Sequence, residues 1–238
     1  MLNKERALVF DLWGDYAHFR RIETTTSPLT YLIPTGTSLA GLISSIIGLE
    51  RDSYYKYFYP KCTKSAVRLL SPIKKIRMNL SLIDTKRGFF LWDIKENPRT
   101  LIPYEFLKEP KYRIYFWTES DKLYRKLRTF LEKHQSVYTP YLGISELIAN
   151  FEYVNEYSIE VPQKAEESVE VHSIVRRNKA KLIIEEGKRY GQERIPLFMD
   201  ENRVVKEYGD VFLELTGKPL RVVDGEYCTI GDDNVIFI

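Results

Sequence analysis

The sequence is 238 residues long, 44% of its residues are hydrophobic, 29% are charged, and its formal net charge is +3. This composition excludes a wholly disordered chain and allows a substantial core, and no apolar run reaches the about 20 residues of a membrane span. The N-terminal residues carry charges where a signal peptide has its apolar segment, and the distant cysteines Cys62 and Cys228 do not suggest a disulfide framework. We therefore expect a cytoplasmic protein that has no membrane partner.

The charge is divided unevenly along the chain. Residues 1–134 contain 24 Lys and Arg against 14 Asp and Glu, whereas residues 135–238 contain 12 against 19. A basic part joined to an acidic part indicates that the basic part binds a polyanion. Chance variation of charge along a chain is the alternative explanation.

The first predicted elements are a strand and a helix. Ala7–Leu12 is short and apolar between polar neighbours, which is typical of a buried strand. After a polar and aromatic loop, 26 consecutive residues, Thr24–Leu49, carry no charged side chain. Within this stretch, hydrophobic residues at helical spacing predict a helix with Thr37 or Ser38 as its N-cap and with Gly48 near its end.

This predicted helix has no face that is suited to solvent. Its hydrophobic stripe consists of Leu39, Leu42, Ile43, Ile46 and Ile47, and its opposite side of Ala40, Gly41, Ser44 and Ser45. A solvated helix normally carries Lys and Glu on that opposite side. We therefore expect the helix to be covered on both sides, either by the rest of the chain or by a partner.

The next elements complete a recognisable order. Lys95–Lys111 contains three prolines and is predicted to be a loop, and Ser120–His134 is predicted to be an amphipathic helix with Ser120 as its N-cap. The order strand, helix, strand, strand, helix, strand is the split βαβ arrangement of a ferredoxin-like fold. We therefore expect an α+β protein with a ferredoxin-like N-terminal domain over residues 1–160. The further predicted strands are Ala66–Leu70, Met78–Ile83, Phe89–Ile94, Arg113–Trp117 and Asn150–Ile159.

Residues 161–238 have a different pattern. Short β-rich segments alternate with turn signals, and no helical stripe of useful length occurs. The last residues, Tyr227–Ile238, have the pattern of a hairpin around Gly231–Asn234. This part is therefore predicted to be a mainly β C-terminal extension.

The motifs of several common enzyme classes are missing. Gly36 and Gly41 have the spacing of a phosphate-binding loop, but Leu42 and Ile43 stand where that motif needs Lys and Ser or Thr. The histidines and cysteines are scattered singly, whereas a zinc site needs three or four close ligands. No metal ion and no cofactor are therefore predicted.

Cations and aromatic residues in the first half suggest single-stranded RNA as the polyanion. Cations hold phosphates while aromatic faces stack on unpaired bases, and the backbone N–H groups at a helix start can bind an anion without a charged side chain. Exposed surface residues without a ligand would have the same spacing. The predicted RNA-binding residues are Tyr16, His18, Arg20, Arg21, Thr37, Ser38, Lys74, Lys75, Arg77 and Arg87.

One constellation could support catalysis. Lys133 and His134 could cleave RNA without a metal, with His134 as the base and Lys133 stabilising the charged intermediate. Lys and His are also favoured at a helix C-terminus by the helix dipole alone. We therefore predict no catalytic residue and keep Lys133 and His134 as the alternative.

Four segments together resemble one family. Gly14–Arg21, Ser27–Leu49, Tyr141–Leu147 and Val171–Val175 resemble the CRISPR-associated "Cas-five" family of the RAMP superfamily, and most closely its type I-B branch. The chain departs from the family before the uncharged helix, where Thr35 and Gly36 stand in place of a second proline or a basic residue. This leaves open whether that loop contacts RNA through side chains or through its backbone.

The resemblance implies a role in antiviral defence. Members of the family bind the 5′ handle of the CRISPR RNA (crRNA) in type I Cascade complexes, and they pack against the large subunit and the first backbone subunit. A thumb-like insertion, here about residues 78–111, often contacts neighbouring RNA. In the type I-C branch the family itself cuts the repeat RNA with Tyr, Lys and His, which keeps a metal-independent endoribonuclease as the alternative. A third hypothesis is a protein-interaction module that docks through the uncharged helix.

Overall fold

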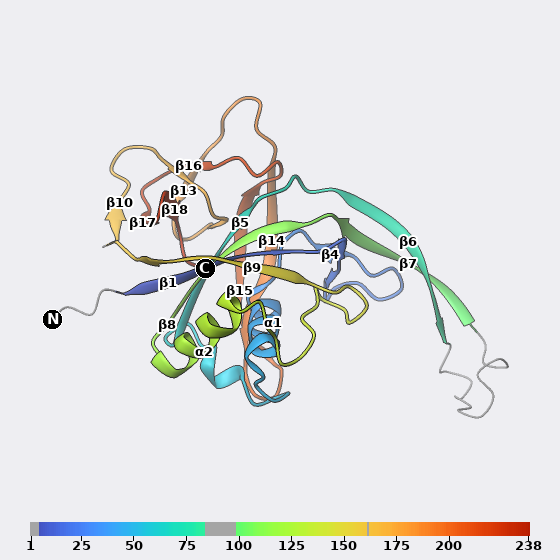
Figure 1. Ribbon diagram of the computed structural model, residues 1–238. Coiled ribbons are helices and arrows are strands. Elements are labelled where there is room, and N and C mark those ends of the chain that lie inside the picture. The colour runs from blue at the N-terminus through green and yellow to red at the C-terminus, as the bar shows by residue number, and fades with distance from the viewer. Residues whose placement is uncertain (1–4, 84–98, 161) are drawn as a thin grey trace.

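The computed structural model describes residues 5–83, 99–160 and 162–238, and it is a mostly β protein with two helices. Its central sheet has the strand order β5-β8-β1-β9, and every neighbouring pair in it is antiparallel. Along the chain, α1 lies between β1 and β5, and α2 lies between β8 and β9 (Figure 1). The strands are β1 (Arg6–Trp13), β5 (Thr63–Leu69), β8 (Lys111–Thr118) and β9 (Asn150–Ser158), and the helices are α1 (Gly36–Ile47) and α2 (Asp121–Glu132).

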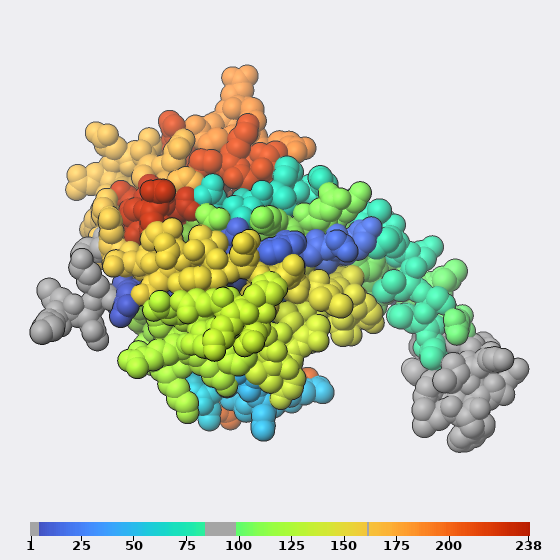
Figure 2. Space-filling model, in the orientation of Figure 1, coloured from blue at the N-terminus to red at the C-terminus, as the bar shows by residue number. Residues whose placement is uncertain are grey.

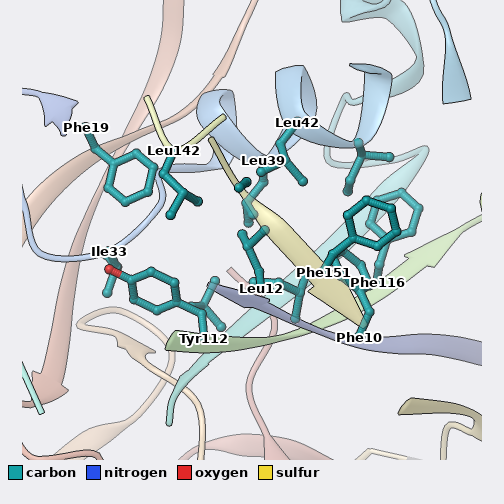
Figure 3. Close-up of a cluster of buried hydrophobic side chains, with 14 of the residues drawn as sticks. Phe10, Leu12, Phe19, Ile33, Leu39, Leu42, Tyr112, Phe116, Leu142 and Phe151 are labelled. Carbon is teal, nitrogen blue, oxygen red and sulfur yellow. The ribbon is translucent and has the colours of Figure 1, made fainter. Parts of the chain in front are cut away.

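Both faces of the central sheet are covered. Leu8, Phe10 and Leu12 of β1 pack into the large cluster that contains the apolar sides of α1 and α2, and part of this cluster is drawn in Figure 3. Ala7 and Val9 point to the other face, where the C-terminal hairpin covers them. A strand that is buried on both faces needs apolar residues at successive positions, which explains the uninterrupted apolar run at residues 7–10.

Thr35 caps the N-terminus of α1. Its backbone is extended, and its Oγ1 accepts a hydrogen bond from the N–H of Ser38 at 3.2 Å. The prediction of Thr37 or Ser38 as the N-cap is therefore wrong, because the extended cap conformation occurs at Thr35 and the helix begins at Gly36. Gly48 ends the helix with φ of 68°, as predicted.

The chain itself covers part of the uncharged side of α1. None of the residues of α1, all of which are described, is exposed. A Cβ on Gly36 would overlap the carbonyl oxygen of Leu197 in β14 (Tyr190–Met199). On the other side, Val137 and Tyr138 donate their backbone N–H groups to the carbonyl oxygens of Ile46 and Ser45 at 3.0 Å. Gly41, Ser44 and Ser45, however, line an open groove. The chain therefore folds back over part of this side of the helix and leaves the rest of it beside the groove.

Helix α2 is amphipathic, as predicted. Ser120 accepts a hydrogen bond from the N–H of Leu123 at 3.3 Å and forms the N-cap, and Asp121 lies in the first turn. Leu123, Leu127 and Leu131 are buried against the sheet. The side that faces away from the sheet carries the charged residues.

A long hairpin projects from the body of the protein (Figures 1 and 2). It consists of β6 (Lys75–Ile83) and β7 (Arg99–Lys108). The predicted loop Lys95–Lys111 is therefore wrong over Arg99–Lys108. A proline has no N–H to donate to a neighbouring strand, so it is tolerated at the edge of a sheet. Pro103 lies at such an edge, because β2 pairs with β7 at Leu107 and Lys108 and no described strand pairs with the outer edge of β7 at Pro103. The predicted strand Phe89–Ile94 lies outside the described residues.

Residues 14–31, the N-terminal strap, run from β1 to α1 along the base of this hairpin. Short strands of the strap pair with the hairpin and with each other. In Figure 2 the strap, in blue, crosses the body toward the hairpin. Its strands are β2 (Tyr16–Ala17), β3 (Phe19–Arg20) and β4 (Thr30–Tyr31), and a short 3-10 helix, Tyr55–Tyr57, follows α1.

The described part of the C-terminal region consists of strands and turns. The terminal hairpin is formed as predicted, with Cys228 opposite Val235. Ile195, Val211 and Leu213 join the same hydrophobic cluster as β1, whereas β14 was not predicted from the sequence. The strands not yet named are β10 (Gln163–Lys164), β11 (Val169–Val171), β12 (Val175–Arg176), β13 (Lys181–Ile183), β15 (Val205–Glu214), β16 (Leu220–Val223), β17 (Glu226–Ile230) and β18 (Asp233–Val235).

Neither helix within the described ranges combines the length and the apolar character that crossing a membrane requires.

Candidate nucleic-acid interface

Glu105 of β7 connects the N-terminal strap to the predicted cations of the hairpin. Its carboxylate accepts hydrogen bonds from Lys75 Nζ at 3.0 Å and from the N–H of Thr30 at 3.4 Å. Its backbone N–H donates to the carbonyl oxygen of Pro28 at 3.0 Å. Because Thr30 is paired with Arg20, the fold brings the predicted cations of the strap and of β6 to the same part of the molecule.

Arg21 forms an internal ion pair. Its guanidinium contacts the carboxylate of Glu193 in β14, whose side chain is 1% exposed. The guanidinium also lies 5.3 Å from the ring centre of Tyr31. Glu193 accepts a second hydrogen bond from the N–H of Leu32 at 2.8 Å. Arg21 therefore fastens the strap to β14, and its positive charge is largely neutralised by Glu193.

Burial raises the pKa of Glu193, while the N–H of Leu32 and the positive charge of Arg21 act in the opposite direction. A buried carboxylate needs such partners because its desolvation costs several kcal/mol. No sequence pattern indicated this pair, since the two residues are 172 positions apart.

His18 is fully buried, so the predicted direct contact between its ring and RNA is wrong for this structure. Its Nδ1 lies 2.7 Å from the carbonyl oxygen of Glu105, to which we assign it as the donor, and its ring packs against Tyr104 and Phe106. Burial lowers its pKa, and the nearby Arg20 adds to this effect. Its backbone N–H donates to the carbonyl oxygen of Leu142. A neutral His18 therefore joins three segments instead of facing solvent.

The remaining predicted cations differ in how freely they meet solvent. Arg20 is exposed, and its guanidinium donates a hydrogen bond of 3.4 Å to the carbonyl oxygen of Thr24. Arg77 is exposed on β6 and takes part in no ion pair within the described ranges. Lys74 and Lys75 are paired with Glu109 and Glu105 but keep 55% and 40% of their side chains exposed. Arg87 lies outside the described residues.

Tyr16 is half-buried, and its ring meets the ring of Phe106 edge-on with centres 6.3 Å apart. Part of the Tyr16 ring is thus exposed to solvent beside the base of the hairpin. The cations that can still reach a phosphate are Arg20, Lys74, Lys75 and Arg77. We call these four residues the strap surface.

Thr37 and Ser38 line a different feature, an open groove of about 1,000 Å³ along α1. Their hydroxyl groups lie 2.9 Å from Oγ1 of Thr35. The groove is also lined by tyrosines that were not predicted as site residues, although the tyrosine-rich run after α1 was visible in the sequence. These are Tyr54, Tyr55, Tyr138 and Tyr141.

Lys133 and His134 follow α2 and are both exposed. Lys133 is the C-cap residue, and His134 has φ of 51°. The ring of His134 stacks on Phe151 with centres 4.9 Å apart. A base and a cation are thus adjacent and accessible to a phosphodiester at this helix end.

No cluster of three potential metal ligands occurs among residues 5–83, 99–160 and 162–238. Cys62 and Cys228 are both free.

A comparison with protein families identifies the chain. A family model described as "CRISPR-associated protein (Cas_Cas5)" matches residues 7–213, which span the central sheet, the strap and most of the C-terminal strands. The chain belongs to this CRISPR-associated Cas5 family. The resemblance found in the sequence is thereby confirmed at the level of the family.

Individual relatives agree with this assignment. The chain is 27% identical over 152 residues to the CRISPR pre-crRNA endoribonuclease Cas5d of Thermus thermophilus, and the alignment covers 59% of this chain and 61% of that protein. Among solved structures, a CRISPR protein from Archaeoglobus fulgidus superposes with a TM-score of 0.61 at 12% identity and covers 97% of this chain and 98% of that one. A chain of a CRISPR RNA-guided surveillance complex superposes with a TM-score of 0.50 at 17% identity, covering 90% of this chain and 91% of that one. The overall fold of this chain is thus shared with these two solved CRISPR proteins.

Proposed function

We propose that this chain is a non-catalytic subunit of a type I, I-B-like CRISPR effector complex, in which it holds the 5′ handle of crRNA. It takes part in antiviral defence in the cytoplasm and helps to assemble the complex by packing against the backbone subunit and the large subunit. The observation that carries this proposal is the strap surface, because two segments distant in sequence meet at Glu105. This residue binds Lys75 and the backbone of Thr30, the partner of Arg20, and it lies opposite Arg77 in the hairpin. Membership of the Cas5 family supports RNA as the polyanion.

The finer assignment of the fold is also part of this proposal. The order β1, α1, β5, β8, α2, β9 and the sheet order β5-β8-β1-β9 support a ferredoxin-like RAMP domain over residues 1–160. Residues 161–238 are then a β-rich extension that shares the core of that domain. The projecting hairpin β6–β7 supports the assignment of residues 78–111 as a thumb-like insertion.

The test is salt-dependent binding of labelled handle RNA by the purified chain, alone and with its partner subunits. Each phosphate contact releases counterions, so affinity should fall steeply as salt rises. Arg77→Ala should weaken binding without lowering the melting temperature, because Arg77 is exposed and has no described ion pair. Arg125→Ala, a change on the exposed side of α2, is the control. Equal affinity for handle RNA and unrelated RNA, with and without partners, would reject the proposal.

A metal-independent endoribonuclease is the second candidate, because the relative from Thermus is described as a pre-crRNA endoribonuclease. The exposed pair Lys133 and His134 could supply the base and the cation. Labelled repeat RNA incubated with excess protein in EDTA separates the two candidates. A discrete cut that His134→Ala abolishes and Lys122→Ala retains would establish the enzyme, whereas intact RNA would eliminate it.

A further inference from the structure

A second group of cations lies on the C-terminal region, which is acidic overall. Residues Arg176–Lys179, the basic turn, connect β12 to β13. The N–H of Lys179 donates to the carbonyl oxygen of Arg176, and the N–H of Arg177 donates to the carbonyl oxygen of Asp210, both at 2.9 Å. Arg177, Asn178 and Lys179 are exposed. The turn is therefore anchored on β15 and holds two cationic side chains in solvent.

The basic turn borders an open hollow of about 410 Å³. Tyr208 forms part of this hollow and is half-buried, and the guanidinium of Arg194 lies 5.5 Å from the centre of its ring. An aromatic ring beside several cations is the combination that holds an unpaired base and its phosphates. The lining residues are Arg176, Arg177, Asn178, Tyr208, Gly209 and Asp210.

The charges around the hollow favour an anion. Arg176 is paired with Glu207 at 2.6 Å, but within the described ranges Arg177, Lys179 and Arg194 take part in no ion pair of 4.0 Å or less. The hollow is lined by one carboxylate, that of Asp210, and by the two cations Arg176 and Arg177; Lys179 follows in the basic turn, and Arg194 lies opposite Asp210 on β14. By contrast, the nearby Lys181 is held by Asp224 at 2.8 Å. Arg177, Lys179 and Arg194 thus place unpaired positive charge beside the hollow.

The hollow and the N-terminal strap share strand β14. Glu193 of β14 holds Arg21 of the strap, and the next residue, Arg194, lies over Tyr208. Tyr208 of β15 is paired with Pro196, two residues beyond Arg194 on β14. An extended strand lying on the strap surface could continue over β14 to the hollow.

We propose that the basic turn, Arg194 and Tyr208 form a second contact for single-stranded RNA, beyond the strap surface. This inference rests on the proposed function, because it extends the same RNA strand. Arg177, Lys179 and Arg194 bind its phosphates, and the ring of Tyr208 stacks on one base. The contact increases affinity only for a strand long enough to reach both surfaces.

The test compares two unstructured RNAs of the same base composition, about 8 and about 24 nucleotides long. Fluorescence anisotropy measures their affinity for the full chain over a range of salt concentrations. The double variant Arg177→Ala/Lys179→Ala should lower the logarithmic salt slope for the long RNA by about 1.4, because two phosphate contacts on a single strand are lost. The slope for the short RNA should stay that of the wild type. Lys181→Ala, which removes a cation already held by Asp224, is the matched control.

Tyr208 provides an independent readout. Tyr208→Ala should weaken binding of the long RNA about tenfold, whereas Tyr208→Phe, which keeps the ring, should bind like the wild type. Thermal melting shows whether each variant is folded. An unchanged salt slope in the Arg177→Ala/Lys179→Ala variant, while the wild type binds, would overturn this inference and leave the proposed function intact. Failure of the folded wild type, alone and with its partner subunits, to bind either RNA would reject both.

Discussion

Helices α1 and α2 have 12 residues each and pack into the same hydrophobic cluster, yet their surroundings differ. Helix α2 buries one side and exposes charged residues on the other. Helix α1 has no exposed residue, because β14 packs on its first turn and the segment around Val137 and Tyr138 binds its last turn, while its remaining side lines the open groove. Coverage from several sides makes α1 depend on contacts far away in the sequence, whereas α2 depends mainly on one face. The following predictions test this difference.

The largest effect is expected for Gly36→Ala, at the first residue of α1. The added Cβ would overlap the backbone carbonyl of Leu197, which cannot move without displacing β14. We expect a loss of about 3 kcal/mol in the free energy of unfolding, measured by urea denaturation. The matched control is Gly41→Ala in the same helix, whose Cβ would lie 3.4 Å from the hydroxyl of Tyr54. This control should be neutral or more stable than the wild type, and equal losses in both variants would contradict the close packing of β14 on α1.

Arg21→Ala tests the ion pair that fastens the strap to β14. Removing the guanidinium leaves the buried carboxylate of Glu193 without its cation, and we expect a loss of about 2–3 kcal/mol near neutral pH. Arg20→Ala, at the exposed neighbour, should change stability by less than about 0.5 kcal/mol.

The loss in Arg21→Ala should depend on pH. Glu193 has a pKa above its ordinary value of 4.5 in the folded wild type, and removing Arg21 raises this pKa further. As pH falls through these raised pKa values toward 4.5, the carboxyl group becomes neutral in both folded proteins, so the difference in stability should shrink. Urea denaturation at neutral pH and near pH 4 measures this. A deficit that grows toward low pH would contradict the role of Arg21 as the partner of a charged Glu193.

His18→Phe tests the buried side chain that joins the strap to β7. Phenylalanine keeps an aromatic side chain but removes the donor to the carbonyl of Glu105, and we expect a loss of about 1 kcal/mol in the free energy of unfolding at neutral pH. Burial lowers the pKa of His18 in the folded protein. Below pH 6.5, the ordinary pKa of histidine, this side chain is therefore protonated in the unfolded chain before it is protonated in the folded one. Wild-type stability should therefore decrease as pH falls below 6.5, and the variant should lack this part of the decrease. Parallel stability curves for the two proteins between pH 7.5 and about pH 5 would refute the buried neutral state.

The smallest effect is expected on the solvated side of α2. Arg125 pairs with Asp121 one turn away, and their side chains are 77% and 71% exposed. Arg125→Ala should change the free energy of unfolding by less than about 0.5 kcal/mol, because water already screens the pair. The effect should disappear in high salt. A loss comparable to that of Gly36→Ala would mean that this side of α2 is also covered.

The sequence indicated most residues of the candidate site, but not which of them face solvent and which bind other residues of the protein. The clustering of Arg20, Arg21, Lys74 and Lys75 with aromatic residues was visible in the sequence. Neighbouring positions nevertheless separate in the fold, because Arg20 meets solvent while Arg21 is paired with Glu193. His18 could not be distinguished from a surface histidine, since its burial depends on β7 and on the segment at Leu142.

The sequence by itself determined the central strands, the amphipathic helix α2 and the lack of charged side chains on α1. These features are local, because the period of apolar residues and the capping residues act within a few positions. Only the tertiary structure decided that β14 and the segment at Val137 pack on α1. It also decided that Glu105 joins the strap to the hairpin and that Glu193 binds Arg21. The position of the basic turn on an acidic region was likewise decided by the fold. Contacts between residues 30 to 172 positions apart leave no local pattern, because they depend on the path of the whole chain.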